Sequence, residues 1–256
     1  MKPTFVSVVV PAYNEAHSIQ GNLDSIVRYL SARFQRFEVV VVNDGSTDGT
    51  QREIAEAASR DGHIEVVLLP ANRGKGFAVR QGVLKAKGDT VLFTDADLST
   101  PVEEIERAVE ELSKGYSVVI ASRQHPQSTI RVRQSWLREL MGKSFNVLIR
   151  TLFPLPYRDT QCGFKCFTQK AAREIFSVTR IDGFTFDVEV LLIAQRLGYS
   201  VKEIPVTWAD VAESKVKLAR GWVAIIRELS AILWNDRRGL YGRRPSMSLP
   251  DPQRKL

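Results

Sequence analysis

The chain has 256 residues, 44% of them hydrophobic and 25% charged, which is the composition of a globular protein with a large core. Its net charge of +7 favours an anionic partner such as nucleic acid, phosphate groups or an acidic membrane surface. Two cysteines are too few for a disulfide framework, and no apolar run of about 18 residues predicts a membrane-spanning helix. We expect one domain over residues 1–236 and a flexible basic tail over 237–256.

Short apolar runs alternate with helix-like patterns through the first half of the chain. Strands are predicted where Val, Ile and other apolar residues cluster, at residues 5–10, 37–42, 64–69, 90–94 and 116–121. Helices are predicted where apolar residues recur at helical spacing, over residues 15–32, 50–58 and 76–86 and after Pro101. This alternation is typical of an α/β fold, with a mostly parallel sheet flanked by helices.

Two aspartates one residue apart, Asp95 and Asp97, follow the predicted strand 90–94 directly. Ligands of open α/β sheets bind outside the carboxyl ends of the strands. Two adjacent carboxylates repel unless a cation neutralises them, and hard oxygen ligands suit Mg²⁺ or Mn²⁺ shared with phosphates. The pair therefore predicts a metal-held diphosphate, although the short motif taken alone also fits a loop with capping aspartates.

Polar clusters also follow the predicted strands 5–10 and 37–42. With the cluster that contains Asp95 and Asp97 there are three, and chance turns are a poor explanation for all of them. The clusters have the sequences PAYNE at 11–15, NDGSTD at 43–48 and DADLS at 95–99. Within the second cluster, Asp48 is interpreted as a helix N-cap. The stretch NRGKG at 72–76 lacks the full phosphate-loop and dinucleotide-binding patterns, so we expect only that Lys75 lies near a diphosphate.

A basic amphipathic segment occupies about residues 123–158, with seven Lys and Arg residues against one acidic residue. Apolar residues at helical spacing are interleaved with these charges, as in helices that lie in a membrane interface. A core helix with solvated charges is the alternative. A second helical pattern at 222–234 is either packed on the domain or an interfacial anchor, and basic residues follow it.

In order and spacing, PAYNE, NDGSTDGT, NRGKG and DADLSTP resemble the family-two glycosyltransferases with the GT-A nucleotide-sugar-binding fold, over about residues 6–217. The later sequence DTQCGFK and the pattern W-x-D-V-x-x-S-K, which ends at Lys215, are similar to the polyprenol-phosphate branch. Within it the chain looks most like the dolichyl-phosphate glucosyltransferases. Mannose synthases tend to carry an Arg shortly before the Ser-Lys pair, where this chain has Ala209 and Asp210.

The resemblance implies a donor site for a nucleotide sugar. Pro11, Tyr13 and Glu15 would hold the nucleoside, while Val42 and Asp44 would line the base pocket. Asn43 departs from the family, which usually has an Asp there. The remaining donor-binding residues implied by the resemblance are Lys75, Asp95, Ala96 and Lys215.

The resemblance also implies a metal and an acceptor site. Mg²⁺ or Mn²⁺ would be held by Asp97, with Asp95 and Ser99 assisting. Arginine binds phosphate through two parallel hydrogen bonds, so the acceptor phosphate is assigned to Arg123, Arg131 and Arg133. Asp159 is the candidate for a base or for orienting the acceptor, and with Asp97 and Arg123 it completes the expected catalytic set. Asp187 and Glu189 are expected to orient basic side chains.

The function implied is an inverting hexosyl transfer, of glucose from UDP-glucose, to dolichyl or polyprenyl phosphate. GDP-mannose and UDP-GlcNAc remain alternative donors. A nucleic-acid-binding module would leave the three strand-end clusters unexplained, and an oxidoreductase would need the glycine fingerprint. We expect no nucleic-acid partner. We expect peripheral association with the cytoplasmic face of a membrane, or a membrane partner protein.

Overall fold

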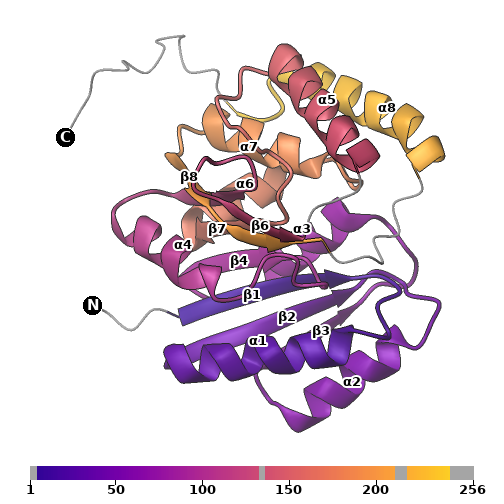
Figure 1. Ribbon diagram of the computed structural model, residues 1–256, viewed down its shortest axis with the longest axis vertical. Coiled ribbons are helices and arrows are strands. Elements are labelled where there is room, and N and C mark those ends of the chain that lie inside the picture. The colour runs from indigo at the N-terminus through magenta and orange to yellow at the C-terminus, as the bar shows by residue number, and fades with distance from the viewer. Residues whose placement is uncertain (1–4, 133–135, 211–217, 243–256) are drawn as a thin grey trace.

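The computed structural model describes residues 5–132, 136–210 and 218–242. Within them a seven-stranded sheet has the order β3-β2-β1-β4-β7-β5-β8, and a small second sheet pairs β6 with β9. Helices cover both faces of the large sheet (Figure 1). The elements are β1 (Phe5–Ala12), α1 (Ile19–Arg33), β2 (Arg36–Asn43), α2 (Thr50–Arg60), β3 (Ile64–Leu68), α3 (Lys75–Lys85), β4 (Thr90–Thr94), α4 (Glu104–Ser113), β5 (Val118–Ser122), β6 (Thr129–Val132), α5 (Trp136–Leu152), β7 (Phe164–Thr168), α6 (Gln169–Val178), α7 (Phe186–Arg196), β8 (Val201–Pro205), β9 (Thr207–Ala209) and α8 (Leu218–Arg237).

The predicted elements of the first half are confirmed, with ends shifted by a few residues. The mostly parallel sheet is also confirmed: β1 pairs in parallel with β2 and β4, β2 with β3, and β5 with β8. Strand β7 is the exception, because it runs antiparallel to both neighbours, β4 and β5. Its amino-terminal end therefore lies beside the carboxyl ends of β4 and β5, and brings residues 159–163 to that edge of the sheet.

Two apolar cores fill the spaces between the sheet and its helices, because successive side chains of a strand point to opposite faces. On one face, α1, α2 and α4 pack over alternate strand residues such as Val8, Val39 and Leu92. On the other face, α3, α5, α6, α7 and α8 share a core that includes Phe93 and Phe167. The result is a three-layer α/β domain whose polar loops gather at the carboxyl edge.

The basic segment 123–158 is not one continuous helix. It contains the end of β5, strand β6 and helix α5, and α5 buries Phe145 and Ile149 in the core beside Leu229 and Ile232 of α8. Both helices lie together at one end of the molecule (Figure 1). The inner faces of α5 and α8 therefore pack on the core, as the alternatives to a membrane-interface helix predicted. Among the described residues, no helix has the length and hydropathy needed to span a bilayer.

The outer face of α8 remains partly apolar. Val223 is 77% exposed, Ile226 is 57% exposed and Trp234 is 60% exposed, and the exposed basic residues Arg237 and Arg238 follow. This combination is typical of a helix that contacts a membrane surface.

The folded part of the chain extends further than the expected boundary at residue 236. Tyr241 is only 1% exposed, and its hydroxyl donates a hydrogen bond to Glu189 (2.6 Å) and accepts one from Asn235 (3.1 Å). Tyr241 thus packs on the domain, and the flexible basic tail expected over 237–256 stays a prediction. Residues 243–256 lie outside the described part.

Candidate active site

The loops after β1 and β2 are tied together by short polar contacts. Asn14 adopts a positive φ of 56°, which its short polar side chain tolerates. Its backbone N–H donates to Ser46 Oγ (3.0 Å), and its side-chain oxygen accepts from the backbone N–H of Thr47 (2.8 Å). Tyr13 next to it is 40% exposed, so its ring is available for stacking on a base.

Asn43 and Asp44 organise the loops rather than facing open solvent. Asn43 accepts a hydrogen bond from the backbone N–H of Ser46 (3.1 Å), which fixes the turn after β2. The carboxylate of Asp44 accepts from Asn72 Nδ2 (2.9 Å) and from the backbone N–H groups of Arg73 (2.8 Å) and Gly74 (2.9 Å). Burial raises the pKa of Asp44, and these two backbone donors partly offset the shift.

Val42 and Asp48 are both held by local packing. The side chain of Val42 is fully buried, and a Cβ atom on Gly82 of α3 would lie 2.9 Å from it, so only its backbone is left to line the expected base pocket. The N-cap residue of α2 is Gly49, one position after Asp48, the expected cap. The Asp48 carboxylate still accepts from the backbone N–H of Thr50 in the first turn (2.9 Å).

An open pocket of about 450 Å³ lies beside this cluster, at the carboxyl ends of β2 and β3. Its walls are formed by Asn43, Gly45, Ser46, Thr47, Gln51, Leu68, Leu69 and Pro70. Asp95 and Asp97 do not line it, so the pocket belongs to the side of the site where the base is expected.

The carboxylate pair, Asp95 and Asp97, lies in a tight turn after β4. Leu98 has a positive φ of 50°, its backbone N–H donates to the carbonyl of Asp95 (3.2 Å), and the backbone N–H of Ser99 donates to Asp97 Oδ1 (2.9 Å). Burial, together with the charge of Asp95, raises the pKa of Asp97. Ala96 contributes its carbonyl, which accepts from Asn22 Nδ2 (2.7 Å).

Lys75 supplies a fixed cation to this pair. Its Nζ lies 2.5 Å from Asp95 Oδ1. Burial alone would lower the pKa of Lys75, but the nearby carboxylates of Asp95, Asp187 and Asp97 outweigh burial and raise it. Lys75 therefore stays charged at neutral pH.

Gly163, in the loop that β7 brings to this edge, lies directly against Asp95. A Cβ atom at position 163 would come within 2.0 Å of Asp95 Oδ2. Only glycine fits there without displacing the carboxylate.

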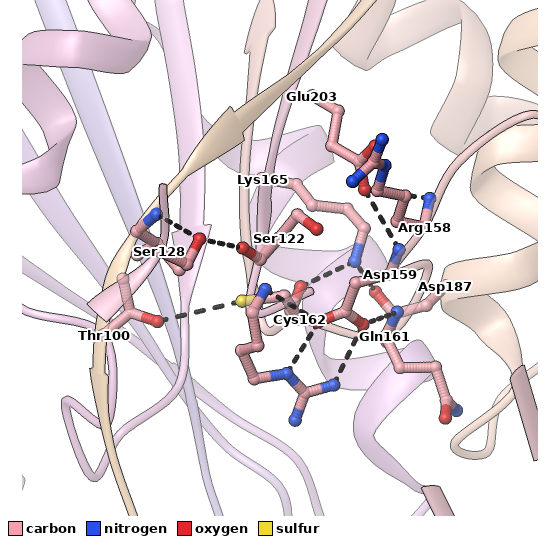
Figure 2. A network of polar contacts seen from close by, with 12 residues as sticks. Thr100, Ser122, Ser128, Arg158, Asp159, Gln161, Cys162, Lys165, Asp187 and Glu203 are labelled. Atoms are coloured by element: carbon pink, nitrogen blue, oxygen red, sulfur yellow. Dashed lines mark hydrogen bonds and ion pairs between the residues drawn. The ribbon is translucent and has the colours of Figure 1, made fainter. Parts of the chain in front are cut away.

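Arg123 and Asp159 form an ion pair with two side-chain hydrogen bonds, and Figure 2 shows the contacts of Asp159. Arg123 donates from Nε to Oδ2 (2.7 Å), from Nη2 to Oδ1 (2.9 Å) and from its backbone N–H to Oδ2 (3.1 Å). Burial alone would raise the pKa of Asp159, but Arg123 and the backbone N–H of Gln161 lower it. A carboxylate so fully hydrogen-bonded is a weak base, and the geometry favours the orienting role for Asp159.

A second ion pair, Lys165 with Asp187, is fully enclosed, and sequence patterns alone did not assign it. Both side chains are at most 3% exposed, and Lys165 Nζ also donates to the carbonyl of Cys162 (2.7 Å). A lysine between buried apolar residues of a strand is the signal that points to such a pair. The expectation that Asp187 orients a basic side chain is confirmed.

Glu189, two residues further along α7, orients backbone groups instead. Its carboxylate accepts from the backbone N–H groups of Arg180 (2.9 Å) and Ile181 (2.9 Å) and from the Tyr241 hydroxyl. On the other side of the Arg123–Asp159 pair, Glu203 accepts from the backbone N–H groups of Arg158 and Asp159 (Figure 2). The loops at 180–181 and 158–159 are thus each held by a carboxylate, buried at Glu189 and half-buried at Glu203.

The remaining predicted residues are spread more widely. Glu15 lies in the loop between β1 and α1, where its backbone N–H donates to Thr50 Oγ1 (2.7 Å). Arg131 is exposed on β6. Arg133 and Lys215 lie outside the described residues. Among the residues that the structure describes, no three His, Cys, Asp or Glu side chains are grouped to hold a metal.

A family model described as glycosyl transferase family 2 matches residues 7–176. The chain belongs to this family. It is 36% identical to the dolichyl-phosphate beta-glucosyltransferase ALG5C of Trichomonas vaginalis, over 93% of this chain and 73% of that one. It is 35% identical to the Homo sapiens dolichyl-phosphate beta-glucosyltransferase, over 88% of this chain and 73% of the relative.

The fold is shared with glucosyl-3-phosphoglycerate synthase from Mycobacterium tuberculosis, which has been crystallised with Mn²⁺, UDP-glucose and phosphoglyceric acid. The TM-score is 0.66 at 21% identity, and the match covers 95% of this chain and 82% of that one. The family and this likeness confirm the GT-A fold.

Proposed function

We propose that this protein transfers glucose from UDP-glucose to dolichyl or polyprenyl phosphate, with inversion at the anomeric carbon. The relatives at 35–36% identity carry the name of this activity. The observation that carries the proposal is the meeting of two charge clusters at one sheet edge. Asp95, which pairs with Lys75, lies against Gly163. The Arg123–Asp159 pair is near enough that, against the lowering by burial and beside the charge of Asp159, the charge of Asp95 contributes to the raised pKa of Arg123.

The carboxylate pair fits a divalent cation. Its oxygens are hard ligands, and burial together with the charge of Asp95 raises the pKa of Asp97, so the ionised form gains from a bound cation. Two carboxylates and the Ser99 hydroxyl make an incomplete set, which suits an ion that shares its remaining positions with phosphate oxygens. Bound Mg²⁺ or Mn²⁺ would neutralise charge on the departing nucleoside diphosphate. The structural neighbour crystallised with Mn²⁺ and UDP-glucose supports this part of the proposal.

Arg123 is the first candidate for binding the acceptor phosphate. It uses Nε and Nη2 for Asp159, and with its side chain 28% exposed it can present Nη1 to a ligand. A phosphate monoester has a second pKa of about 6 and is largely ionised at neutral pH. Such a nucleophile needs no strong base, which fits the lowered pKa of Asp159. In this proposal Asp159 orients Arg123, and Arg131, Arg133 and Lys215 remain predicted contacts.

The proposal includes peripheral binding at the cytoplasmic face of a membrane, with a separate membrane partner as the alternative. It is supported by the exposed apolar face of α8, with Val223, Ile226 and Trp234, and by the basic residues that follow it. Apolar side chains beside Lys and Arg are favourable at the boundary of an anionic bilayer.

The test is a donor panel with purified protein, vesicles that contain dolichyl phosphate, and Mg²⁺ or Mn²⁺. UDP-glucose, UDP-GlcNAc and GDP-mannose, each labelled in the sugar, are supplied in separate reactions. We expect label from UDP-glucose alone to enter an organic-extractable, acid-labile lipid. Vesicles with dolichol in place of dolichyl phosphate are the control and should take up none. Label from GDP-mannose would reassign the donor, and no transfer from any donor would overturn the proposal.

A further inference from the structure

The segment 180–185, between α6 and α7, lies against the loop that carries Lys75. The carbonyl of Asp182 accepts a hydrogen bond from the backbone N–H of Phe77 (3.1 Å). The Asp182 carboxylate accepts from Arg73 (3.1 Å) and Arg80 (2.9 Å). The segment therefore contacts residues on both sides of Lys75.

The backbones of residues 74–76 and 181–183 are so close that a side chain at Gly74 or Gly76 would clash. Gly74 has a φ of 107°, and a Cβ atom there would lie 2.5 Å from the carbonyl oxygen of Asp182. A Cβ atom at Gly76 would lie 2.5 Å from the carbonyl oxygen of Ile181. Since Lys75 stands between these glycines, a shift of 181–183 would move the backbone of Lys75.

Helix α8 holds the opposite side of the same segment. Glu228 Oε2 accepts from the backbone N–H of Thr185 (3.1 Å) and from its hydroxyl (2.7 Å). A Cβ atom at Gly183 would come within 1.9 Å of Glu228 Oε1, so the carboxylate lies flat on the Gly183 backbone. Glu228 thus contacts the segment at two residues.

A continuous chain of contacts runs from α8 to the carboxylate pair. Glu228 holds Thr185, the 181–183 backbone packs on Gly74 and Gly76, and Lys75 between them pairs with Asp95. Lys75 Nζ lies 2.5 Å from Asp95 Oδ1, so its position sets the local charge at the proposed donor site.

We propose that Glu228 is a positioning residue for the donor site, which acts through segment 180–185 on Lys75. This inference rests on the proposed function for its kinetic consequence, because it assumes that Lys75 and Asp95 bind the sugar nucleotide. Its structural part does not depend on turnover. One consequence is that a shift of α8, which carries the exposed apolar face, would also shift the backbone around Lys75.

The experiment compares Glu228→Ala with Asp236→Ala. Asp236 also ties α8 to α7, through two hydrogen bonds of 2.7 Å from Arg196, but at the other end of α7. Both variants lose a carboxylate that anchors α8, so they are matched in general destabilisation. Glu228→Gln keeps a side-chain oxygen that can accept from Thr185 and serves as the rescue variant.

The first readout is amide hydrogen exchange of the peptide that covers residues 72–78. We expect faster exchange in Glu228→Ala, and exchange at the wild-type rate in Asp236→Ala and Glu228→Gln. Equal acceleration in Glu228→Ala and Asp236→Ala, or no acceleration in either, would overturn the proposal. This readout needs no activity, so it stands apart from any failure of the proposed function.

The second readout is the split between KM and kcat with UDP-glucose as donor. Glu228→Ala should raise the donor KM about tenfold, the equivalent of about 1.4 kcal/mol, and leave the KM for the lipid acceptor unchanged. Thr185→Ala, which removes only the hydroxyl contact, should show a smaller rise. An equal rise in both KM values, or a fall in kcat alone, would contradict positioning of the donor site.

Discussion

The charged side chains on the two sides of the candidate active site differ in how far they are exposed to solvent. On the donor side, the side chains of Asp95 and Lys75 are 35% and 21% exposed, and Asp97 has a raised pKa. On the acceptor side, the carboxylate of Asp159 and the ammonium of Lys165 are fully buried, and each is held by an oppositely charged partner.

This difference separates groups that can exchange a ligand from groups that hold the scaffold. A half-buried carboxylate such as Asp97, whose pKa is raised by burial and by the charge of Asp95, gains when a cation arrives. A buried pair with complete hydrogen bonding cannot open without leaving an uncompensated charge in a dry interior. The comparison therefore predicts that donor-side changes affect activity and that changes to the buried pairs affect stability.

The largest effect is expected for Asp97→Asn. The substitution keeps the size of the side chain and removes the charge that would hold the cation, so transfer should fall by at least about 100-fold. Its thermal unfolding should remain close to that of the wild type. The measurement is label transferred to lipid, together with a melting curve. Near-normal transfer would remove Asp97 from the metal site.

Lys165→Met should act on stability. It leaves Asp187 buried without its cation, and the free energy of unfolding should fall by about 3–5 kcal/mol. Lys114→Met is the matched control, because Lys114 is half exposed in its ion pairs and its loss should leave the stability close to that of the wild type. Urea unfolding measures both. A Lys165→Met variant as stable as Lys114→Met would contradict the scaffold role.

Asp159→Asn should show a pH-dependent loss. The pKa of Asp159 is lowered in the folded state, so its stabilisation is fully present above the unfolded value of about 3.9 and is lost as the pH falls through the folded value. Wild type should exceed the variant by about 2 kcal/mol at neutral pH, because Arg123 is partly exposed. The gap should narrow below about pH 4. A gap that widens on acidification would show that Asp159 is protonated in the fold.

The smallest effect is expected for Arg131→Ala. Because Arg131 is exposed on β6, its loss should leave folding intact and raise the KM for the lipid acceptor by about tenfold. The donor KM should not change. Steady-state kinetics with each substrate varied in turn makes the measurement. A selective rise in the donor KM would mean that the basic segment serves the nucleotide instead.

Local sequence patterns were sufficient to predict the strands and helices of the donor half of the molecule. Each strand there is a short apolar run followed by a helix, so parallel pairing places the loops after β1, β2 and β4 at one edge. This rule places the carboxylate pair at that edge, whereas Lys75 was expected there from the NRGKG stretch before α3. The burial of the Val42 side chain was not evident from the sequence, because it depends on the close packing of Gly82 of α3.

The acceptor half depends on contacts that sequence spacing does not encode. The antiparallel direction of β7 puts Gly163 beside Asp95 and aligns Lys165 with Phe93. The apolar run of β7 does not indicate whether the strand pairs in parallel or antiparallel. The Glu189–Tyr241 contact joins residues 52 positions apart. Such pairs depend on tertiary packing, which overrides local propensity.

The most direct test of the account is the anomeric configuration of the product. UDP-glucose is α-linked, and a single displacement by the lipid phosphate inverts that centre. Purified protein, dolichyl phosphate and UDP-glucose labelled with ¹³C at the anomeric carbon should give a β-linked glucosyl phosphodiester, read from the coupling between the anomeric and neighbouring protons by NMR. An α-linked product, or free glucose with no lipid product, would contradict the proposed direct attack.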